Sequence, residues 1–202
     1  MAKPETRLGG FVAYATSRPT ARAGAIRQAI GGDYKVEQDF YRRFRLAVDA
    51  DRRGARNGSA IAAAVANANE HKAARFTALA RRWPSVATRW DDCRHTEVER
   101  ATINIAGLGL TLSPSFAELH PDGLLELVTM CYANKKYSAS DIDMVLRVVQ
   151  RAYEPLHPKA TITFVDLPGR RIRTSAGKDL TRHDTRIETD AAGLAYALRN
   201  AA

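Results

Sequence analysis

The chain has 202 residues, of which 45% are hydrophobic, 26% are charged and two are cysteines. This composition is that of a globular protein, long enough for one substantial core or two small ones, and it excludes collagen-like, disordered and membrane-spanning chains. Lysine and arginine outnumber aspartate and glutamate by 31 to 22, and the resulting net charge of +9 favours a polyanionic partner.

The charge is uneven along the chain and dominated by arginine. Residues 1–100 carry 19 basic against 11 acidic side chains, whereas residues 101–158 carry 4 against 6. Arginine suits phosphate because of its planar fork, although an Ala- and Arg-rich chain is also typical of bacterial genomes rich in G and C. We expect a cytoplasmic protein, because no apolar segment of signal-peptide length follows the initial MAKPETRLGG and two cysteines agree with a reducing compartment.

Residues 1–32 are rich in glycine, alanine and arginine and lack a long apolar stripe. We expect a flexible basic arm that the core does not need. The alternation of Phe11 and Ala13 with Val12 and Tyr14 leaves a strand or staple in this arm as the alternative. From residue 33 onward we expect a single α/β domain, helical over residues 33–83 and containing the sheet over residues 98–202.

Helical spacing dominates the first part of this domain. Apolar residues recur every four positions over residues 33–53, which predicts an amphipathic helix with Asp33 as its N-cap. A second helical pattern runs from Ser59 to Trp83 and ends because Pro84 cannot continue it. Asn67 and Asn69 are the points where this pattern would divide.

Strand-like patterns follow. Apolar residues alternate over residues 98–105 and 108–112, and the change of parity at Ala106-Gly107 predicts a hairpin turn or bulge. Residues 124–132 form a nearly continuous apolar run, which predicts a central strand covered on both faces. Ser140 and Asp143 have capping-box spacing before a helix that stops ahead of Pro155.

The remaining elements are two strands and a helix. Residues 161–167 and 170–174 predict strands on either side of the Pro168-Gly169 turn, and residues 190–200 predict the last helix. The sequence therefore predicts an α/β fold with a central mixed or mostly antiparallel sheet of four to five strands, packed helices and an N-terminal helical region.

The order of these elements from residue 33 to 167 resembles the restriction-endonuclease-like nuclease superfamily, whose core is a helix, three antiparallel strands, a crossover helix and a further strand. In active members, an aspartate and an acid-x-Lys motif hold a divalent metal that activates water. The nearest match is Asp122 followed by Glu126-Leu127-Val128, with valine in the lysine position. Lys135 and Lys136 follow at the wrong spacing. The resemblance therefore implies a degenerate active site without a cofactor; Mg²⁺ or Mn²⁺ is implied only if the protein is a working nuclease.

Cysteine and histidine offer a second, weaker pattern. Cys93 and His95 would need His120 and Cys131 beside them to complete a four-ligand metal site. Core packing is the favoured interpretation of Cys131, because it lies within an apolar strand. We therefore assign no metal ligand.

Clustered arginines are the candidate nucleic-acid-binding residues: Arg42, Arg43, Arg52, Arg53, Arg170, Arg171 and Arg173. In the first cluster, acidic residues four positions away would neutralise part of the helix face. The last three flank the Pro168-Gly169 turn, where a basic hairpin could reach a phosphate backbone, although edge strands also carry charge to avoid aggregation.

The function we expect is a nuclease-like, non-catalytic protein that binds nucleic acid, or a nucleic-acid-processing complex, through arginine. One alternative is a protein-interaction or scaffold subunit without nucleic-acid contact. The other is a metal-dependent nuclease with a displaced lysine. A membrane partner is not expected, and the sequence leaves open the oligomeric state and the choice between DNA and RNA.

Overall fold

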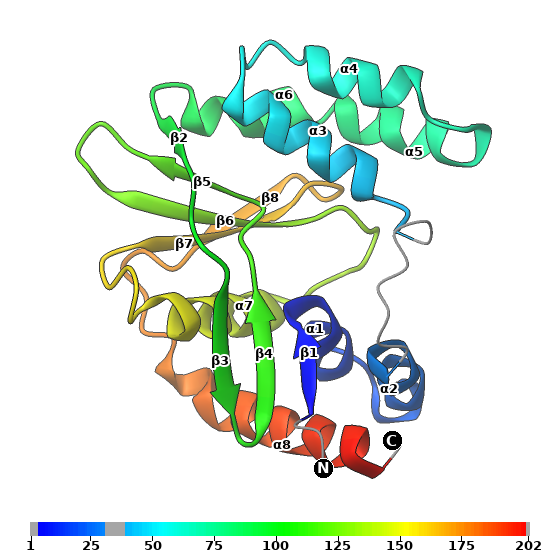
Figure 1. Ribbon diagram of the computed structural model, residues 1–202, viewed down its shortest axis with the longest axis vertical. Coiled ribbons are helices and arrows are strands. Elements are labelled where there is room, and N and C mark those ends of the chain that lie inside the picture. The colour runs from blue at the N-terminus through cyan, green and yellow to red at the C-terminus, as the bar shows by residue number, and fades with distance from the viewer. Residues whose placement is uncertain (1–3, 31–38, 201–202) are drawn as a thin grey trace.

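The computed structural model describes residues 4–30 and 39–200 of the chain. These residues form an α/β fold with two mixed sheets, which confirms the predicted fold class (Figure 1). The smaller sheet has the strand order β1-β4-β3, and the larger has the order β2-β5-β6-β7-β8. No helix within the described ranges has both the length and the apolar character needed to cross a membrane.

The bounds of the elements are as follows. The helices are α1 (Leu8–Ala15), α2 (Arg22–Ile30), α3 (Arg42–Arg53), α4 (Ser59–Ala66), α5 (Glu70–Ala80), α6 (Trp83–Ala87), α7 (Ala139–Tyr153) and α8 (Asp184–Asn200). The strands are β1 (Glu5–Arg7), β2 (Arg94–Thr96), β3 (Ala101–Ile105), β4 (Leu108–Leu112), β5 (Phe116–Leu119), β6 (Leu125–Cys131), β7 (Thr161–Asp166) and β8 (Arg171–Thr174).

The five-stranded sheet separates two apolar clusters. Neighbouring residues of a strand point to opposite faces, so Leu127 of β6 packs with α7 and α8 while Val128 packs with α3 and α5. Helices α3 to α6, which we name the helical layer, cover one face, and α7 covers the other (Figure 1). β6 is thus the central, doubly covered strand that the apolar run predicts.

Helix α7 is the crossover between the parallel strands β6 and β7. Its N-terminus is closed by a capping box, although not the predicted one. Ser138 is the N-cap, its Oγ accepts a hydrogen bond from the Asp141 backbone N–H at 3.1 Å, and the Asp141 carboxylate accepts from the Ser138 backbone. The prediction of Ser140 and Asp143 was therefore two residues too late, because both pairs have the same spacing.

The predicted hairpin is confirmed between β3 and β4, and its two-residue turn is Ala106-Gly107. Both residues have positive φ, 47° and 84°, as this kind of tight hairpin turn requires. The hairpin pairs with β1 and does not join the five-stranded sheet. The antiparallel partner of β6 is instead β5, which pairs in turn with β2, and the sequence pattern predicted neither of these two short strands.

The N-terminal segment is a correction. Residues 4–30 do not form an arm, because β1 pairs in parallel with β4 and Phe11 of α1 is fully buried in the main apolar cluster. A Cβ atom on Gly193 of α8 would lie only 2.7 Å from the Tyr14 hydroxyl oxygen, so the two helices are in close contact. Residues 1–3 and 31–32 of the expected arm lie outside the described residues.

The helical layer agrees with the sequence pattern except at its start. Helix α3 begins at Arg42, and the predicted cap at Asp33 lies outside the described residues. The second pattern divides as expected, because α4 ends at Ala66 and the side chain of Asn69 caps α5 by accepting from the Lys72 backbone N–H at 3.1 Å. Pro84 lies in the first turn of the short α6, where a missing N–H is tolerated.

Candidate functional site

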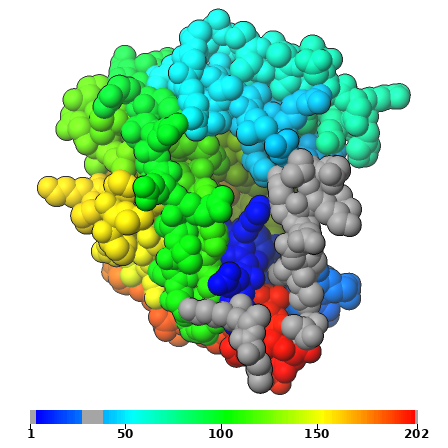
Figure 2. Space-filling view, in the orientation of Figure 1, coloured from blue at the N-terminus to red at the C-terminus, as the bar shows by residue number. Residues whose placement is uncertain are grey.

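A large cleft lies where the two sheets and the helical layer meet. Its volume is about 850 Å³. Helix α3 forms one wall, β1 and the start of α1 form the opposite wall, and β5 and β6 supply the floor. In the space-filling view the cleft opens below α3, in cyan, and above the N-terminal segment, in blue (Figure 2).

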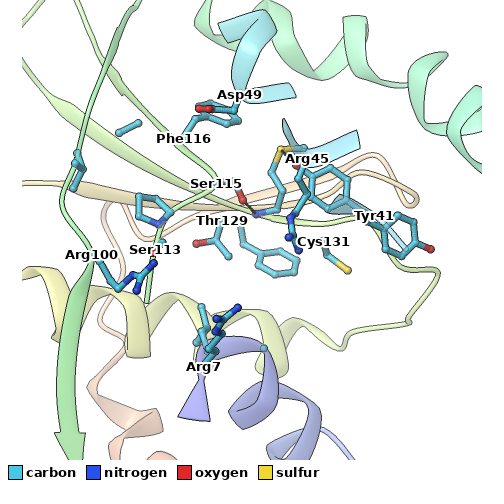
Figure 3. Close-up of a pocket in the computed structure, with 18 of the residues that line it drawn as sticks. Arg7, Tyr41, Arg45, Asp49, Arg100, Ser113, Ser115, Phe116, Thr129 and Cys131 are labelled. Atoms are coloured by element: carbon cyan, nitrogen blue, oxygen red, sulfur yellow. Dashed lines mark hydrogen bonds between the residues drawn. The ribbon is translucent and has the colours of Figure 1, made fainter. Parts of the chain in front are cut away.

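Arginine is the main charged residue of the cleft. Four arginines line it: Arg7 from β1, Arg45 and Arg53 from α3, and Arg100 from the segment before β3. The lining also contains two carboxylates, Asp49 and Glu97. Arg7, Arg45 and Arg100 extend toward a common space from three sides (Figure 3). The two acids are ion-paired with Arg53, at 2.9 Å for Asp49 and 2.5 Å for Glu97. The lining of the cleft therefore contains four arginines and two carboxylates.

Arg45 also forms an ion pair, with Asp39 at 2.5 Å, although 44% of its side chain stays exposed. Arg100 forms neither a hydrogen bond nor an ion pair within residues 4–30 and 39–200, and it is exposed. Since a guanidinium is charged at all accessible pH values, Arg100 is available to an anion that enters the cleft.

Hydroxyl groups and aromatic rings complete the lining. The hydroxyl-bearing residues near the floor are Ser113, Ser115 and Thr129, and Tyr41 and Tyr137 lie at the side of the cleft. The Oγ1 atom of Thr129 is buried and has no hydrogen-bond partner among the described residues. Burial raises the pKa of Tyr137 above its ordinary range, so its hydroxyl stays protonated and remains a donor. The floor thus combines hydrogen-bonding groups with apolar surface.

His95 of β2 also lines the cleft. Burial lowers its pKa, although the carboxylate of Glu118 opposes the shift, and the ring is neutral at neutral pH. Neither ring nitrogen has a hydrogen-bond partner in the part of the chain that the structure describes. A buried polar nitrogen without a partner is unfavourable by about 1–3 kcal/mol, and folded proteins contain few of them.

Most of the predicted arginines of α3 are engaged within the protein. Arg52 is buried and donates to Glu118 at 2.7 Å. Arg53 pairs with Asp49 and Glu97, as described above, and Arg43 donates to the backbone oxygen of Asn67. Arg42 is exposed and forms no ion pair with any described residue.

The arginines around the Pro168-Gly169 turn are also mostly paired. Arg171 donates to Asp166 at 2.7 Å, and Arg173 donates to Asp143 at 2.6 Å. Arg170 is exposed and, within the described ranges, has no side-chain partner. It also has a positive φ of 52° directly after the turn. Of the seven predicted arginines, only Arg53 lines the cleft.

The structure does not bring Asp122 and Glu126 together in one cleft. Asp122 is exposed in the β5–β6 turn, and its carboxylate accepts from the Leu124 backbone N–H at 2.9 Å. Glu126 is buried and accepts hydrogen bonds from four side chains: Arg89, Trp90, His120 and Thr163. Burial alone would raise the pKa of Glu126, but these donors and the Arg89 charge outweigh it and hold the pKa below its ordinary value.

Glu118 is the register partner of Glu126 across β5 and β6, and both point into the helical layer. Arg52 and Arg56 donate to the two oxygens of Glu118, at 2.7 Å and 3.1 Å. The two buried carboxylates are therefore neutralised by cations from α3, the loop after it and the end of the helical layer.

Cysteines and histidines do not assemble into a four-ligand site. Cys131 lies beside the cleft, whereas Cys93 lies near His120. Among the described residues, no group of three or more histidine, cysteine, aspartate and glutamate side chains could hold a metal ion.

The sequence prediction missed Arg7, Arg45 and Arg100. Arg45 carried a signal, because Tyr41, Arg45 and Asp49 are four positions apart and so share one face of α3. Arg7 carried none, because its position depends on pairing of β1 with β4, about a hundred residues later. Comparison of the chain with models of known protein families and with curated proteins found no match.

Proposed function

We propose that this protein binds a single strand of nucleic acid in the cleft and does not cleave it. The observation that carries the proposal is the convergence of Arg7, Arg45 and Arg100 on one space from three separate elements (Figure 3). Arginines that converge in this way match the spaced negative charges of a phosphate backbone.

The dimensions of the cleft favour a single strand. A volume of about 850 Å³ accommodates a few nucleotides, whereas a duplex is far wider. Tyr41 and Tyr137 offer ring surface for base stacking, and Ser113 and Thr129 offer hydroxyls to base edges or sugars. Stacking on aromatic rings together with a positive groove is the usual basis of single-strand binding.

The nuclease-like fold is part of the proposal. Helices of the helical layer precede three antiparallel strands, β2, β5 and β6, after which α7 crosses to the parallel strand β7. This order agrees with the core of the restriction-endonuclease-like superfamily, although its first two strands are not the ones that the sequence predicted.

The lack of cleavage follows from the state of the carboxylates. Glu126 is the acid of the nearest acid-x-Lys match, and Glu118 is its register partner on the neighbouring strand. Here Arg52 and Arg56 neutralise Glu118, and Arg89 lies 3.1 Å from Glu126. A cation that is part of the protein thus takes the position of the metal charge.

Fluorescence anisotropy with a labelled strand of about 12 nucleotides, within the range of known single-strand sites, tests the proposal. The variant Arg7→Gln/Arg45→Gln/Arg100→Gln removes the cleft charges. A matched control, Arg81→Gln/Arg170→Gln/Arg199→Gln, removes the same net charge from exposed positions outside the cleft. We expect the slope of log K against log salt to fall by about two units in the cleft variant, since each lost contact removes about 0.7.

The control variant should keep a slope close to that of the unmodified protein. Equal weakening by both variants would contradict a cleft site and leave only general attraction to the net charge. Magnesium-dependent cleavage that Glu126→Gln abolishes would favour the nuclease alternative. If neither DNA nor RNA binds in a salt-sensitive way, the scaffold alternative is favoured.

A further inference from the structure

Three side chains outside the cleft form a connected chain. The Cys93 Sγ atom lies 3.4 Å from Nδ1 of His120, and Nε2 of His120 lies 2.6 Å from a carboxylate oxygen of Glu126. Cys93 precedes β2, His120 follows β5 and Glu126 belongs to β6. The tertiary structure therefore assembles a thiol, an imidazole and a carboxylate in the order of a nucleophile, its base and the group that orients the base.

Glu126 is fixed firmly enough to orient the imidazole. Trp90 donates its indole N–H to the same oxygen that faces His120, at 2.9 Å, and Arg89 and Thr163 donate to the other oxygen. An ionised carboxylate only accepts hydrogen bonds, so Nε2 of His120 carries the hydrogen of this contact. In the neutral ring Nδ1 then has a free lone pair, and this lone pair faces the Cys93 thiol.

We propose that Cys93, His120 and Glu126 form a nucleophilic thiol site that reacts with small activated esters. The thiol gives its proton to Nδ1 of His120 while sulfur attacks the ester carbonyl carbon. As the new S–C bond forms and the C–O bond to the leaving group breaks, His120 returns the proton to the departing oxygen. The products are an acyl group on Cys93 and a free alcohol, so no further reactant is needed.

The residues around Cys93 determine the protonation state of its thiol and the size of the molecule that can reach it. Burial raises the pKa of Cys93, as do the carboxylates of Glu118 and Glu126, while the guanidinium groups of Arg52 and Arg56 oppose the shift. The thiol therefore rests in its protonated form and needs His120 to react near neutral pH. Cys93 is only 8% exposed, whereas 25% of the His120 side chain is exposed, so only a small, uncharged ester would reach sulfur, from the His120 side.

The probe is p-nitrophenyl acetate, used with the 202-residue chain carrying Cys131→Ser so that Cys93 is its only thiol. We expect release of close to one p-nitrophenolate per protein and an acetyl group on the Cys93 peptide by mass spectrometry. His120→Gln keeps a donor for Glu126 but removes the base, and it should slow acetylation of Cys93 by at least ~100-fold. His71→Gln, on the exposed surface of α5, is the matched histidine control and should leave the rate unchanged.

A pH profile separates this role from a merely structural one. The acetylation rate of the parent protein should level off at a lower pH than that of His120→Gln, in which the thiol must ionise unaided. Far-UV circular dichroism verifies that His120→Gln folds; if it does not, Glu126→Gln is measured in the same way and should slow the reaction through loss of the orienting carboxylate. Equal rates and equal profiles in the parent and in the folded variant, or acetylation of lysines alone, would overturn the proposal.

Discussion

At the scale of single residues, some arginines of this protein form buried ion pairs and do not lie on its surface. Arg52 has 1% of its side chain exposed and pairs with Glu118, which is fully buried. Its guanidinium also donates to the backbone oxygen of Trp90 at 2.7 Å, so it connects α3 to the segment that follows α6. Arg52, which the sequence predicted to bind phosphate, is therefore a buried residue that holds parts of the fold together.

Arg52→Met should reduce the free energy of unfolding by about 3 kcal/mol, because it leaves the buried Glu118 charge with Arg56 alone. Urea unfolding followed by circular dichroism measures this change. Arg42→Met is the matched control on the same helix and should stay within about 0.5 kcal/mol of the unmodified protein, since Arg42 is exposed. Similar losses in the two variants would contradict the structural role of Arg52.

Asp143 supplies a pH-dependent contribution to stability. The hydrogen bond from Arg173 holds the pKa of this buried carboxyl below its ordinary value of about 3.9, although burial opposes the shift. A carboxyl whose pKa is lower in the folded state stabilises the fold above about pH 4, and the contribution is lost as the pH falls through the folded-state value.

Arg173→Gln should therefore be less stable than the unmodified protein at pH 7. The difference should begin to shrink as the pH falls below about 4, because the carboxyl of Asp143 then takes up a proton in the unfolded chain before it does so in the folded protein. Urea midpoints at several pH values measure the difference. A gap that stays constant from pH 7 to pH 3 would mean that Arg173 contributes packing and not charge.

At the scale of elements, the N-terminal segment is the clearest departure from expectation. Its short helix α1 contributes Phe11, Val12 and Tyr14 to the main apolar cluster, and β1 completes the three-stranded sheet. The same segment supplies Arg7 to the cleft. Core and candidate site thus depend on residues that lack a long apolar stripe, because a helix of eight residues needs only a few buried side chains.

Phe11→Ala should reduce the free energy of unfolding by about 3–5 kcal/mol, the usual effect of truncating a fully buried phenylalanine. Chemical denaturation measures the loss. Tyr196→Ala, at an aromatic residue of α8 that is 67% exposed, is the control and should change stability little. A nearly unchanged midpoint for Phe11→Ala would restore the interpretation of residues 4–30 as a dispensable arm.

At the scale of the whole molecule, the five-stranded sheet joins two cores. The cluster with α1, α7 and α8 and the cluster within the helical layer share β6 and β7, whose alternate residues belong to one or the other. Loss of either cluster exposes one face of the same strands. We therefore expect residues 4–30 and 39–200 to unfold as one unit.

Tryptophan fluorescence tests this expectation, because both tryptophans, Trp83 at the start of α6 and Trp90 shortly after it, belong to the apolar cluster beneath the helical layer. Phe11 lies in the other cluster. In Phe11→Ala, the urea midpoint from fluorescence should fall as far as the midpoint from far-UV circular dichroism. A fluorescence midpoint that stays at its original value would divide the chain into two independently stable units.

The extent to which the sequence predicted the fold depended on the range of the interactions. The hairpin at Ala106-Gly107, the break before Asn69 and helix α7 were predicted, since each depends on residues within about four positions of one another. The pairing of β6 with β5 was not predicted, because β5 has only four residues and is flanked on both sides by turn residues. The capping box was misplaced because two serine–aspartate pairs overlap in sequence.

The candidate site followed the same division. The sequence by itself determined an α/β chain with an excess of arginine, whereas the nucleic-acid partner stays a prediction. Only the tertiary structure decided which arginines are neutralised and which line the cleft: Arg52 pairs with Glu118, 66 positions away, whereas Arg7 reaches the cleft through β4. The physical reason is that periodicity reports which face of an element is apolar, whereas ion pairing and cleft formation depend on contacts between elements that no local pattern encodes.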